Sequence, residues 1–421
     1  MSEIKGIAVC GLGKLGSPIA AVFAASSVPV IGFDIDPKKV EALASFAPPV
    51  CETELLEYLE LDEVRRHLRA TVNIEEAVQL SDACLFVTPT PSISDGSFDH
   101  SYLLSAITVV AKEVAKKKRR KYLFVICSTV MPSFLTNQVA PLLRRYLNGY
   151  GYGYGLVYKP EFIALGTVIR DLHYPDILLI GEESEEDGEK VEKLYRQMVL
   201  HDCQARRMPL TDAELAKISL NCFVTMKISF ANQIGQVSRR LGADAKKVLG
   251  AIGFDRRIGH AALLPGLPFG GPCFPRDNRM FKRVAEQVGE RALLAEATDL
   301  VNLRSLRCLL TEVPDHGDVG ILGLAYKPGA SISDDSAGDW WAHALRSRGR
   351  RVKTHDPLVP HTSELKDVLA CPTIIVGCPW PQYKSLTLAV GTKILDPSGE
   401  IKITWVQKGE AVCETYKEVM A

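Results

Sequence analysis

The sequence predicts an α/β protein with two Rossmann-like doubly wound domains joined by a central long-helix domain. A glycine-rich turn stands between a strand-like run at residues 4–9 and a helix-like run at 17–26. A second series of four strand-like runs begins at Val319 and covers residues 319–324, 352–355, 373–377 and 393–395. Between the two series, residues 211–241 follow the helical period without a proline. At 421 residues the chain is too long for one core. We expect a first domain over 1–205, a central helical domain over 206–312 and a C-terminal domain over 313–421.

Composition and charge exclude several kinds of partner. Fifty basic residues balance fifty acidic ones, which leaves no net field for nucleic acid or an anionic membrane surface. No apolar stretch approaches the roughly 20 residues of a membrane span, and the N-terminus lacks the pattern of a signal peptide. The 11 cysteines are odd in number and form no C-x-x-C pair, as is usual in a reducing compartment. We expect a cytoplasmic protein with no metal ion and no nucleic-acid or membrane partner.

The glycine-rich turn has the spacing G-x-G-x-x-G, formed by Gly11, Gly13 and Gly16. The first glycine makes the turn, the second lets the backbone approach a pyrophosphate, and the third packs the helix on the strand. Asp34 ends the next strand-like run, 28–33, where its carboxylate can accept both ribose hydroxyls and would repel a 2′-phosphate. The motif therefore predicts that NAD, and not NADP, is the cofactor.

Polar side chains follow several of the strand-like runs. The runs at 83–87 and 122–127 lead to Thr90 and Thr129, and ligands of open α/β sheets bind at the carboxyl ends of strands. These threonines are placed to meet the cofactor, although a hydroxyl at a strand end is more often a cap. Glu161 follows another strand and a proline. It is a candidate acid or base, with a surface carboxylate as the equal alternative.

Residues 265–277 form a loop in which glycines and prolines surround Cys273, and Asp277 follows four residues later. Paired glycines let the backbone come close to a ligand, and prolines stiffen the loop. We expect a reaction centre here, with a tight turn around a buried cysteine as the alternative. Beyond the loop, residues 279–310 are expected to form one helical segment.

The helix predicted at 211–241 is roughly thirty residues long, with Thr211 or Asp212 as its cap. A helix of this length suits a spine between two domains or a dimer interface. Lys217 and Asn221 are four residues apart and share one face of it. That face is solvated by default, but apolar neighbours flank both residues and make a functional face the competing interpretation.

In order along the chain, these motifs resemble those of the nucleotide-sugar dehydrogenases of the UDP-glucose and GDP-mannose 6-dehydrogenase type. The resemblance runs from end to end. It implies that the first domain holds NAD, that the central helices form a homodimer or higher homo-oligomer, and that the C-terminal domain holds the nucleotide of the substrate. The residues that carry it are Gly11-Leu12-Gly13 with Asp34, Pro89-Thr90-Pro91, Ser128-Thr129-Val130, Pro160-Glu161-Phe162, Ala216-Lys217 with Asn221, Arg257-Ile258-Gly259, the loop 265–277, Leu322-Gly323-Leu324-Ala325-Tyr326-Lys327, and Asp356-Pro357.

The same resemblance implies oxidation of a primary alcohol to a carboxylate in two hydride transfers, without release of the aldehyde. Cys273 would attack the aldehyde, and the thiohemiacetal would lose a second hydride to become a thioester. Lys217 and Asn221 would donate to the oxyanion at the reacting carbon. Asp277 and Thr129, with a water, would serve proton transfer.

Further roles follow from the matching positions. Glu161 would act as the base in thioester hydrolysis, and Arg257 would reach into the substrate site of the neighbouring subunit. The expected cofactor contacts are Gly11, Leu12, Gly13, Lys14, Leu15, Gly16, Asp34, Lys39, Thr90, Thr129 and Arg276. The expected substrate contacts are Glu161, Phe162, Leu165, Lys217, Asn221, Arg257, Phe269, Gly270, Gly271, Tyr326 and Lys327.

Some positions depart from the family pattern. The family continues P-E-F-L-R-E-G, whereas residues 163–166 read I-A-L-G and lack both the arginine and the second glutamate. Asp334 stands where the family has an arginine that contacts the cofactor. Arg276 replaces a lysine, and Ser398 replaces a late basic residue. Because the catalytic residues are retained, we expect the chemistry to carry over and the substrate to differ near the reacting carbon.

Two other functions stay open. The first is a two-electron NAD-dependent alcohol dehydrogenase acting on an atypical nucleotide-linked substrate or a small hydroxy acid, which would yield one NADH per substrate instead of two. The second is a sugar-nucleotide-binding protein without turnover. The second is disfavoured because Cys273, Lys217, Asn221 and Asp277 all persist.

Overall fold

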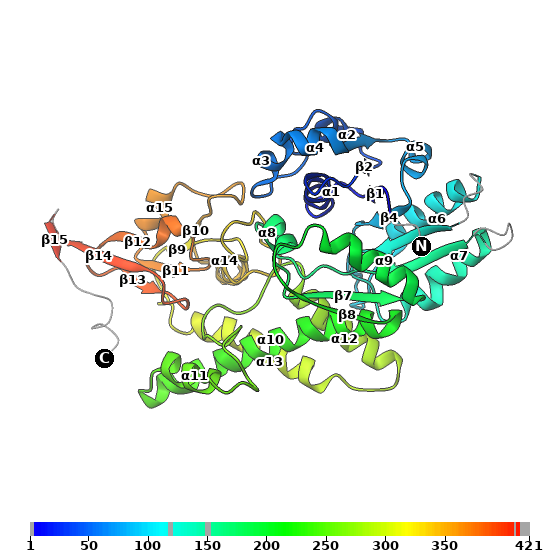
Figure 1. The fold of residues 1–421 in the computed structure, drawn as a ribbon. Coiled ribbons are helices and arrows are strands. Elements are labelled where there is room, and N and C mark those ends of the chain that lie inside the picture. The colour runs from blue at the N-terminus through cyan, green and yellow to red at the C-terminus, as the bar shows by residue number, and fades with distance from the viewer. Residues whose placement is uncertain (1–3, 117–120, 148–152, 408–409, 413–421) are drawn as a thin grey trace. The chain divides into compact units, whose positions relative to one another are not determined.

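The computed structural model describes residues 4–116, 121–147, 153–407 and 410–412. The chain divides into two compact units, Met1–Ile218 and Ser219–Ala421. Helix α10 (Leu210–Leu241) begins in the first unit and continues into the second (Figure 1). Over the described ranges, no helix combines the length and the apolar character that crossing a membrane requires.

The first unit alternates strands and helices, as the sequence predicts. Its elements before α10 are β1 (Ile7–Cys10), α1 (Gly16–Ala25), β2 (Val30–Phe33), α2 (Pro37–Ala44), α3 (Leu55–Glu60), α4 (Asp62–His67), β3 (Leu68–Thr71), α5 (Ile74–Gln79), β4 (Ala83–Phe86), α6 (Ser101–Lys116), β5 (Lys121–Ile126), a π-helical turn η1 (Leu135–Val139), α7 (Ala140–Leu147), β6 (Gly153–Tyr158), α8 (Val168–His173), β7 (Ile177–Glu182), α9 (Glu185–Arg196) and β8 (Gln204–Pro209). The eight strands form one sheet in the order β3-β2-β1-β4-β5-β6-β7-β8. Only β6 and β7 pair antiparallel.

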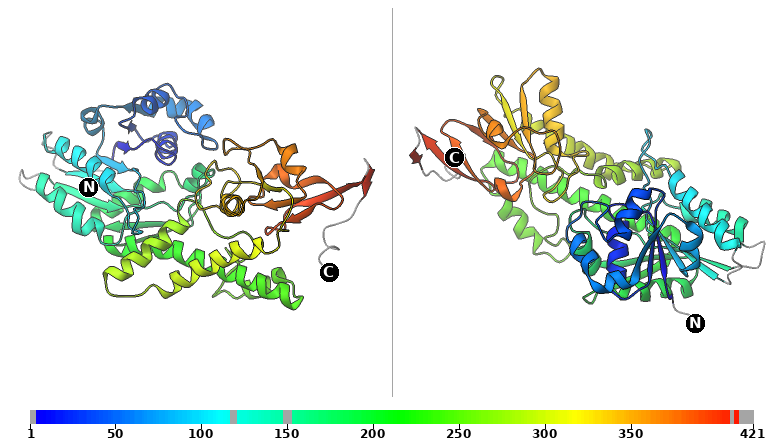
Figure 2. Two further views of the ribbon diagram at one scale, coloured as in Figure 1. Left: turned by 180° about the vertical axis from the view of Figure 1, so that it is seen from behind. Right: turned by 90° about the horizontal axis from the view of Figure 1, so that it is seen from above.

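Both faces of this sheet are buried. Along β1, Ile7 and Val9 belong to one apolar cluster, and Ala8 and Cys10 belong to another. Helices α1, α3, α4 and α9 contribute to the first cluster, whereas α5, α6 and α7 contribute to the second. The right-hand view of Figure 2 shows α1 lying across one face of the strands. Helices on both faces of a mostly parallel sheet make the predicted doubly wound Rossmann fold.

The predicted strands of this unit are present, but β1 and β2 start later than predicted. Pro29 has no N–H group to donate to the ladder, so β2 begins at Val30 and not at residue 28. The Pro29 carbonyl accepts a hydrogen bond from the N–H of Ile7 at 2.9 Å, and this first cross-strand bond sets the start of β1. The predicted cap of α10 is wrong, because Thr211 and Asp212 lie inside its first turn.

The second unit contains the rest of α10, three further long helical segments and a second α/β lobe. Its elements are α11 (Ala245–Gly253), α12 (Phe274–Gln287), α13 (Leu293–Leu310), β9 (Val319–Leu322), α14 (Ala337–Ser347), β10 (Val352–His355), α15 (Leu365–Leu369), β11 (Thr373–Val376), a 3-10 turn η3 (Pro381–Tyr383), β12 (Ser385–Ala389), β13 (Lys393–Leu395), β14 (Lys402–Gln407) and β15 (Glu410–Val412). Strands β10, β9, β11 and β13 form a parallel sheet in that order, at the four predicted places. A second sheet, β12-β14-β15, was not predicted; it ends in the red hairpin of Figure 1.

The single helical segment predicted at 279–310 is wrong. Helix α12 starts five residues earlier, at Phe274, directly after the cysteine loop. It ends at Gln287, and α13 starts at Leu293. Gly289, at φ 78°, takes the left-handed conformation that ends helices and that glycine adopts without strain. The break separates a helix that carries the cysteine loop from one that supports it.

Candidate functional site

The glycine turn of the first unit leaves room for a ligand at one position only. Gly11 has φ 104°, and a Cβ there would lie 2.5 Å from the Val87 carbonyl oxygen. A Cβ on Gly16 would overlap the Gly11 carbonyl oxygen, whereas a Cβ on Gly13 would meet nothing within 4 Å. Helix α1 begins here with no side-chain cap and no acidic residue in its first turn. These features fit the close approach of a pyrophosphate to Gly13 and the helix N-terminus.

Asp34 is held beside this turn. The carboxylate is 7% exposed, and Oδ2 accepts the N–H of Leu12 at 2.7 Å while Oδ1 accepts that of Asp36 at 2.9 Å. Lys39 Nζ lies 3.5 Å from Oδ2. An ionised carboxylate has about four acceptor positions, so two backbone donors leave capacity for ribose hydroxyls. This acceptor capacity fits the ribose of NAD, and contact of Asp34 with the cofactor stays a prediction.

The second α/β lobe repeats this arrangement, but its carboxylate already accepts hydrogen bonds from five protein donors. Asp356 follows β10 as Asp34 follows β2, and the N–H of Gly323 donates to the His355 carbonyl at 2.8 Å, as that of Gly11 does to Phe33. The carboxylate of Asp356 is 4% exposed and already has five donors. These are the N–H groups of Leu324 and Ala325 and the indole of Trp380 on Oδ2, and the N–H groups of Leu358 and Val359 on Oδ1.

The loops after β4 and β5 are tied together through the two predicted threonines. Thr90 is buried, and its hydroxyl donates to the Thr129 carbonyl at 2.8 Å. Ser128 donates to the Thr88 carbonyl at 2.7 Å. The structure thus brings Thr90 and Thr129 together, and the lone pairs of the Thr90 hydroxyl remain as acceptors. Contact of either residue with the cofactor stays a prediction.

Glu161, Phe162 and Lys217 meet at the end of β6. Lys217 Nζ donates to the Glu161 carbonyl at 2.7 Å and lies 4.3 Å from the centroid of the Phe162 ring. Sequence reasoning missed Lys159, whose Nζ lies 2.9 Å from Glu161 Oε2. Its signal in the sequence was a charged residue that directly follows the apolar end of a strand. Glu161 therefore has a lysine on its side chain and another on its backbone.

The loop that departs from the family pattern, 163–166, is anchored by a carboxylate that the sequence did not reveal. Glu52 accepts the N–H of Gly166 at 3.0 Å through Oε2 and that of Val168 at 3.1 Å through Oε1. Ile163 and Leu165 pack against the first apolar cluster. The loop thus replaces a charged pair with side chains directed at a core.

Cys273 is exposed and stands immediately before α12, at the positive end of the helix dipole. Two asparagines that sequence reasoning missed hold the backbone of its loop. Asn232 of α10 accepts the N–H of Gly266 at 2.8 Å, and Asn302 of α13 accepts the N–H of Phe269 at 2.9 Å. Asn302 also donates to the Phe269 carbonyl, again at 2.9 Å. The loop is therefore supported from two helices.

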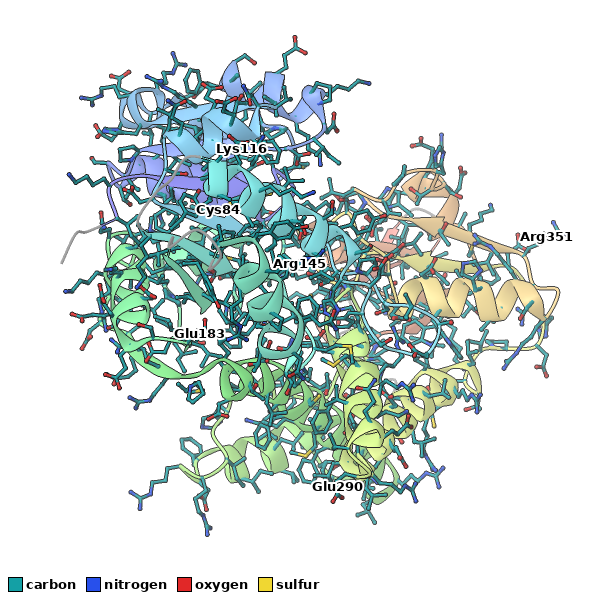
Figure 3. All side chains as sticks on the ribbon, turned by 90° about the vertical axis from the view of Figure 1, so that its right-hand side faces the viewer. Cys84, Lys116, Arg145, Glu183, Glu290 and Arg351 are labelled. Atoms are coloured by element: carbon teal, nitrogen blue, oxygen red, sulfur yellow. The ribbon has the colours of Figure 1, made fainter. Side chains whose placement is uncertain are left out.

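Of the other described cysteines, Cys51 is exposed as well, whereas Cys84 and Cys222 contrast with Cys273 in their surroundings. Cys84 lies inside the first unit (Figure 3) and burial raises its pKa well above the ordinary value, with Cys10 beside it adding to the effect. Burial, with Asp277 and Asp299 nearby, raises the pKa of Cys222 to about 12. These thiols are protonated at neutral pH and are poor nucleophiles.

Asn221 and Asp277 meet in the second unit. Asn221 Nδ2 donates to Asp277 Oδ2 at 2.6 Å. Arg276 donates through Nε to Oδ1 at 3.0 Å, and its Nη2 lies 2.9 Å from the same oxygen. The carboxylate is fully buried, so these groups replace its hydration. The N–H of Asp277 donates to the Cys273 carbonyl at 2.8 Å. Within this unit, the predicted Asn221, Cys273 and Asp277 are therefore connected by hydrogen bonds at the start of α12.

The glycine pair of the loop is packed against the predicted substrate residues of the second lobe. A Cβ on Gly271 would lie 2.5 Å from Tyr326 Cδ2, and the N–H of Gly271 donates to the Asp334 carbonyl at 2.8 Å. A Cβ on Gly270 would overlap the backbone of Asp335. Lys327 follows Tyr326, with its Nζ 6.0 Å from the ring centroid. Both glycines are therefore required by packing within the protein.

A cavity of about 420 Å³ borders the cysteine loop in the second unit. Its lining includes Pro265 and Gly266 from the loop, Asn232 and Lys246 from the helices, and Ser398. Its volume lies in the range of about 300–1,000 Å³ that is usual for small-molecule sites. Arg257, by contrast, has an 84% exposed side chain and pairs with Asp255 at 2.7 Å, so its expected contact with another subunit stays a prediction.

Two family models match this chain. The NAD-binding domain of the UDP-glucose/GDP-mannose dehydrogenase family matches residues 5–199, and the central domain of the same family matches residues 211–304.

Individual relatives match over nearly the whole chain. UDP-glucose 6-dehydrogenase AglM of Haloferax volcanii is 30% identical over 400 residues, which cover 90% of this chain and 92% of that protein. GDP-mannose 6-dehydrogenase of Azotobacter vinelandii is 26% identical, with 97% and 99% covered. Among solved structures, a UDP-glucose dehydrogenase from the hyperthermophilic archaeon Pyrobaculum islandicum is similar with a TM-score of 0.86 at 30% identity, over 96% of this chain and 98% of that one.

Proposed function

Because the chain belongs to the UDP-glucose/GDP-mannose dehydrogenase family and carries its NAD-binding domain, we propose that it oxidises the primary alcohol of a nucleotide sugar to a carboxylate in two successive two-electron steps. The observation that supports this proposal best is the exposed thiol of Cys273 at the start of α12, on a loop held by two asparagines. A cysteine that only fills space would be buried, as Cys84 is.

The proposed chemistry balances around one sulfur atom. Bound NAD would accept one hydride in each oxidation. The Cys273 thiolate adds to the aldehyde carbon, forming a C–S bond and an alkoxide, and loss of hydride from that carbon leaves a thioester. Water then attacks the thioester carbon, Glu161 takes the proton, and the C–S bond breaks to return the thiolate. One alcohol, one water and two NAD⁺ would thus give one carboxylate, two NADH and three protons.

The other residues hold charge and geometry in this scheme. Lys217 and Asn221, one turn apart on α10, donate to the oxyanion at the reacting carbon, an effect worth roughly 3 kcal/mol per donor in comparable sites. Asp277 orients Asn221 through the 2.6 Å hydrogen bond, and Arg276 balances its buried charge. The names of the relatives support a UDP- or GDP-linked donor, and the cavity beside the cysteine loop has a suitable size for part of it.

We further propose that two copies of the chain associate through α10. Phe223, Phe230 and Val237 are spaced seven residues apart and, with Leu241, form an apolar stripe along one side of the helix. Each of them is between 44% and 76% exposed. An exposed stripe of this length is typical of an interface. Phe230→Glu should shift the sedimentation coefficient from dimer to monomer, and an unchanged value would contradict this interface.

The decisive experiment is NADH yield with a panel of UDP-, GDP- and dTDP-linked sugars, followed by Cys273→Ser on the best substrate. Wild type should release two NADH per substrate. The serine variant should lose the second oxidation, because a hydroxyl is a far weaker nucleophile than a thiolate at neutral pH. Cys222→Ser is the matched control and should keep the yield of two. A wild-type yield of one would instead support a two-electron dehydrogenase, and a serine variant that still gives two would exclude the covalent step.

A further inference from the structure

A charged pair is buried at the end of β6. Lys159 is 1% exposed, and its Nζ lies 2.9 Å from Glu161 Oε2. The same Nζ lies 4.3 Å from the centroid of the Tyr195 ring of α9 and 3.3 Å from the Pro160 carbonyl oxygen. A buried ammonium ion loses its hydration, so it persists only where a partner compensates for that loss. Glu161 is that partner.

The two oxygens of the Glu161 carboxylate differ in their surroundings. Oε2 is turned to Lys159, whereas Oε1 is buried and, among the residues that the structure describes, accepts no hydrogen bond. Lys217 holds the backbone carbonyl of the same residue at 2.7 Å. Lys159 therefore holds the Glu161 side chain through one oxygen, and Lys217 holds the Glu161 backbone. The Tyr195 hydroxyl also lies near this carboxylate, but Oε1 itself has no hydrogen-bond partner among the described residues. Oε1 therefore keeps lone pairs with which it can take a proton from water.

We propose that Lys159 is a positioning residue, whose ammonium group holds Oε2 of Glu161 in an ion pair and leaves Oε1 as the atom that takes the proton of the hydrolytic water. This inference rests on the proposed function, in which water cleaves the Cys273 thioester. In that step a water O–H bond breaks, its proton goes to Oε1, and its oxygen bonds to the thioester carbon. The electrons of the C–S bond return to sulfur. Lys159 itself transfers no proton.

Other ionisable groups near Glu161 do not supply the compensating charge. Burial, with Glu161 nearby, raises the pKa of Cys127 to about 12, and burial raises the pKa of Tyr195 well above its ordinary value. Both groups are therefore neutral at pH 7. Cys203 is likewise an uncharged thiol, since burial raises its pKa. The ammonium of Lys217 is directed at the backbone carbonyl. Lys159 supplies a positive charge in direct contact with the carboxylate, with its Nζ 2.9 Å from Oε2.

The first test needs no ligand and measures thermal unfolding of the full chain from pH 5 to pH 8. Lys159→Met leaves a buried carboxylate without its cation, so its Tm should drop most at pH 8 and recover towards pH 5 as Glu161 takes up a proton. The double variant Lys159→Met with Glu161→Gln should regain most of the loss at pH 8. Lys193→Met removes an exposed ion pair of α9 with Glu189 and should change little at any pH. An equal loss of Tm in the single and double variants would overturn the pairing.

The second test follows turnover with whichever nucleotide sugar gives the most NADH. In Lys159→Met, the acid limb of the pH profile of kcat should move to higher pH by at least about one unit, and hydrolysis should slow by at least about tenfold. Mass spectrometry should then find acyl-enzyme on the peptide that contains Cys273. Lys159→Arg should restore part of the rate because it restores the charge. If Lys159→Met kept the acid limb of the wild-type pH profile and accumulated no acyl-enzyme, Lys159 would have only a structural role and the inference would be overturned.

Failure of the proposed function would look different. If wild type released no NADH and formed no adduct at Cys273 with any sugar of the panel, the oxidation proposal would fall. The comparison of the single and double variants in unfolding would still decide whether Lys159 and Glu161 form a stabilising pair.

Discussion

Replacing Asn302 with alanine should loosen the loop that carries Cys273. The Asn302 side chain makes two hydrogen bonds to the Phe269 peptide group, both 2.9 Å long and spanning 33 residues of sequence. Each such bond contributes about 1 kcal/mol net, and leaving a buried N–H or C=O unpaired costs about 1–3 kcal/mol. Phe269 is only 6% exposed, so water replaces these partners incompletely. We therefore expect a loss of about 2–4 kcal/mol in the free energy of unfolding of the second unit.

Activity should fall further than stability alone explains, because a displacement of about 1 Å at a reacting group can reduce the rate about 100-fold. The assay pairs urea unfolding with kcat/KM for Asn302→Ala, and Arg304→Ala, an exposed position on the same helix, is the control. The control should stay within about 0.5 kcal/mol of wild type. If Asn302→Ala also stayed within that margin and kept kcat/KM within about twofold, the two hydrogen bonds would not hold the loop.

Three further predictions follow from other parts of the chain. NAD should be preferred over NADP because the buried carboxylate of Asp34 would face the 2′-phosphate, and equal kcat/KM with both cofactors would show that Asp34 does not lie at the ribose. The apolar loop 163–166 should make UDP-glucose and GDP-mannose poor substrates compared with the true one, and kcat/KM near about 10⁴ M⁻¹s⁻¹ on either would show that the loop is neutral. Burial raises the pKa of Glu214 from 4.5 to about 7 although it accepts the N–H groups of Ser133 and Leu135. The folded protein then binds more protons than the unfolded chain between these values, so stability should fall by about 3 kcal/mol as pH rises from 4.5 to 7, and Glu214→Gln should flatten that slope in unfolding measured across this range.

The parts of the fold that local pattern determines were predicted well. The glycine turn with Asp34, the long helix α10 and the four strands of the second lobe each depend on residues close in sequence. The break at Gly289 was missed because the apolar period continues on both sides of a single glycine. The three-stranded sheet was missed because β12 pairs with β14 and not with β13, the strand that follows it in the chain.

The support of the candidate site was beyond prediction for a different reason. Asn302, Asn232 and Glu52 act on backbone groups 33, 34 and 114 residues away, and an isolated asparagine or glutamate carries no sign of such a partner. Lys159 lies two residues from Glu161, yet their pairing depends on burial that α9 and the sheet create together. Motifs show which residues are suited to chemistry, and the contacts that hold them appear only with the fold.

The two α/β lobes carry a carboxylate at corresponding positions, Asp34 after β2 and Asp356 after β10, and differ in what bonds to it. A strand, a glycine turn, a helix, a second strand and an aspartate occur in this order in both lobes. In the first lobe, the Asp34 carboxylate keeps acceptor capacity for a ligand. In the second lobe, the indole of Trp380 and four backbone N–H groups already occupy the acceptor positions of the Asp356 carboxylate. Asp356 therefore connects the glycine turn, the loop after β10 and the segment before β12. Replacing the aspartate with asparagine should therefore lower the affinity for the cofactor at Asp34 and lower the stability of the second lobe at Asp356.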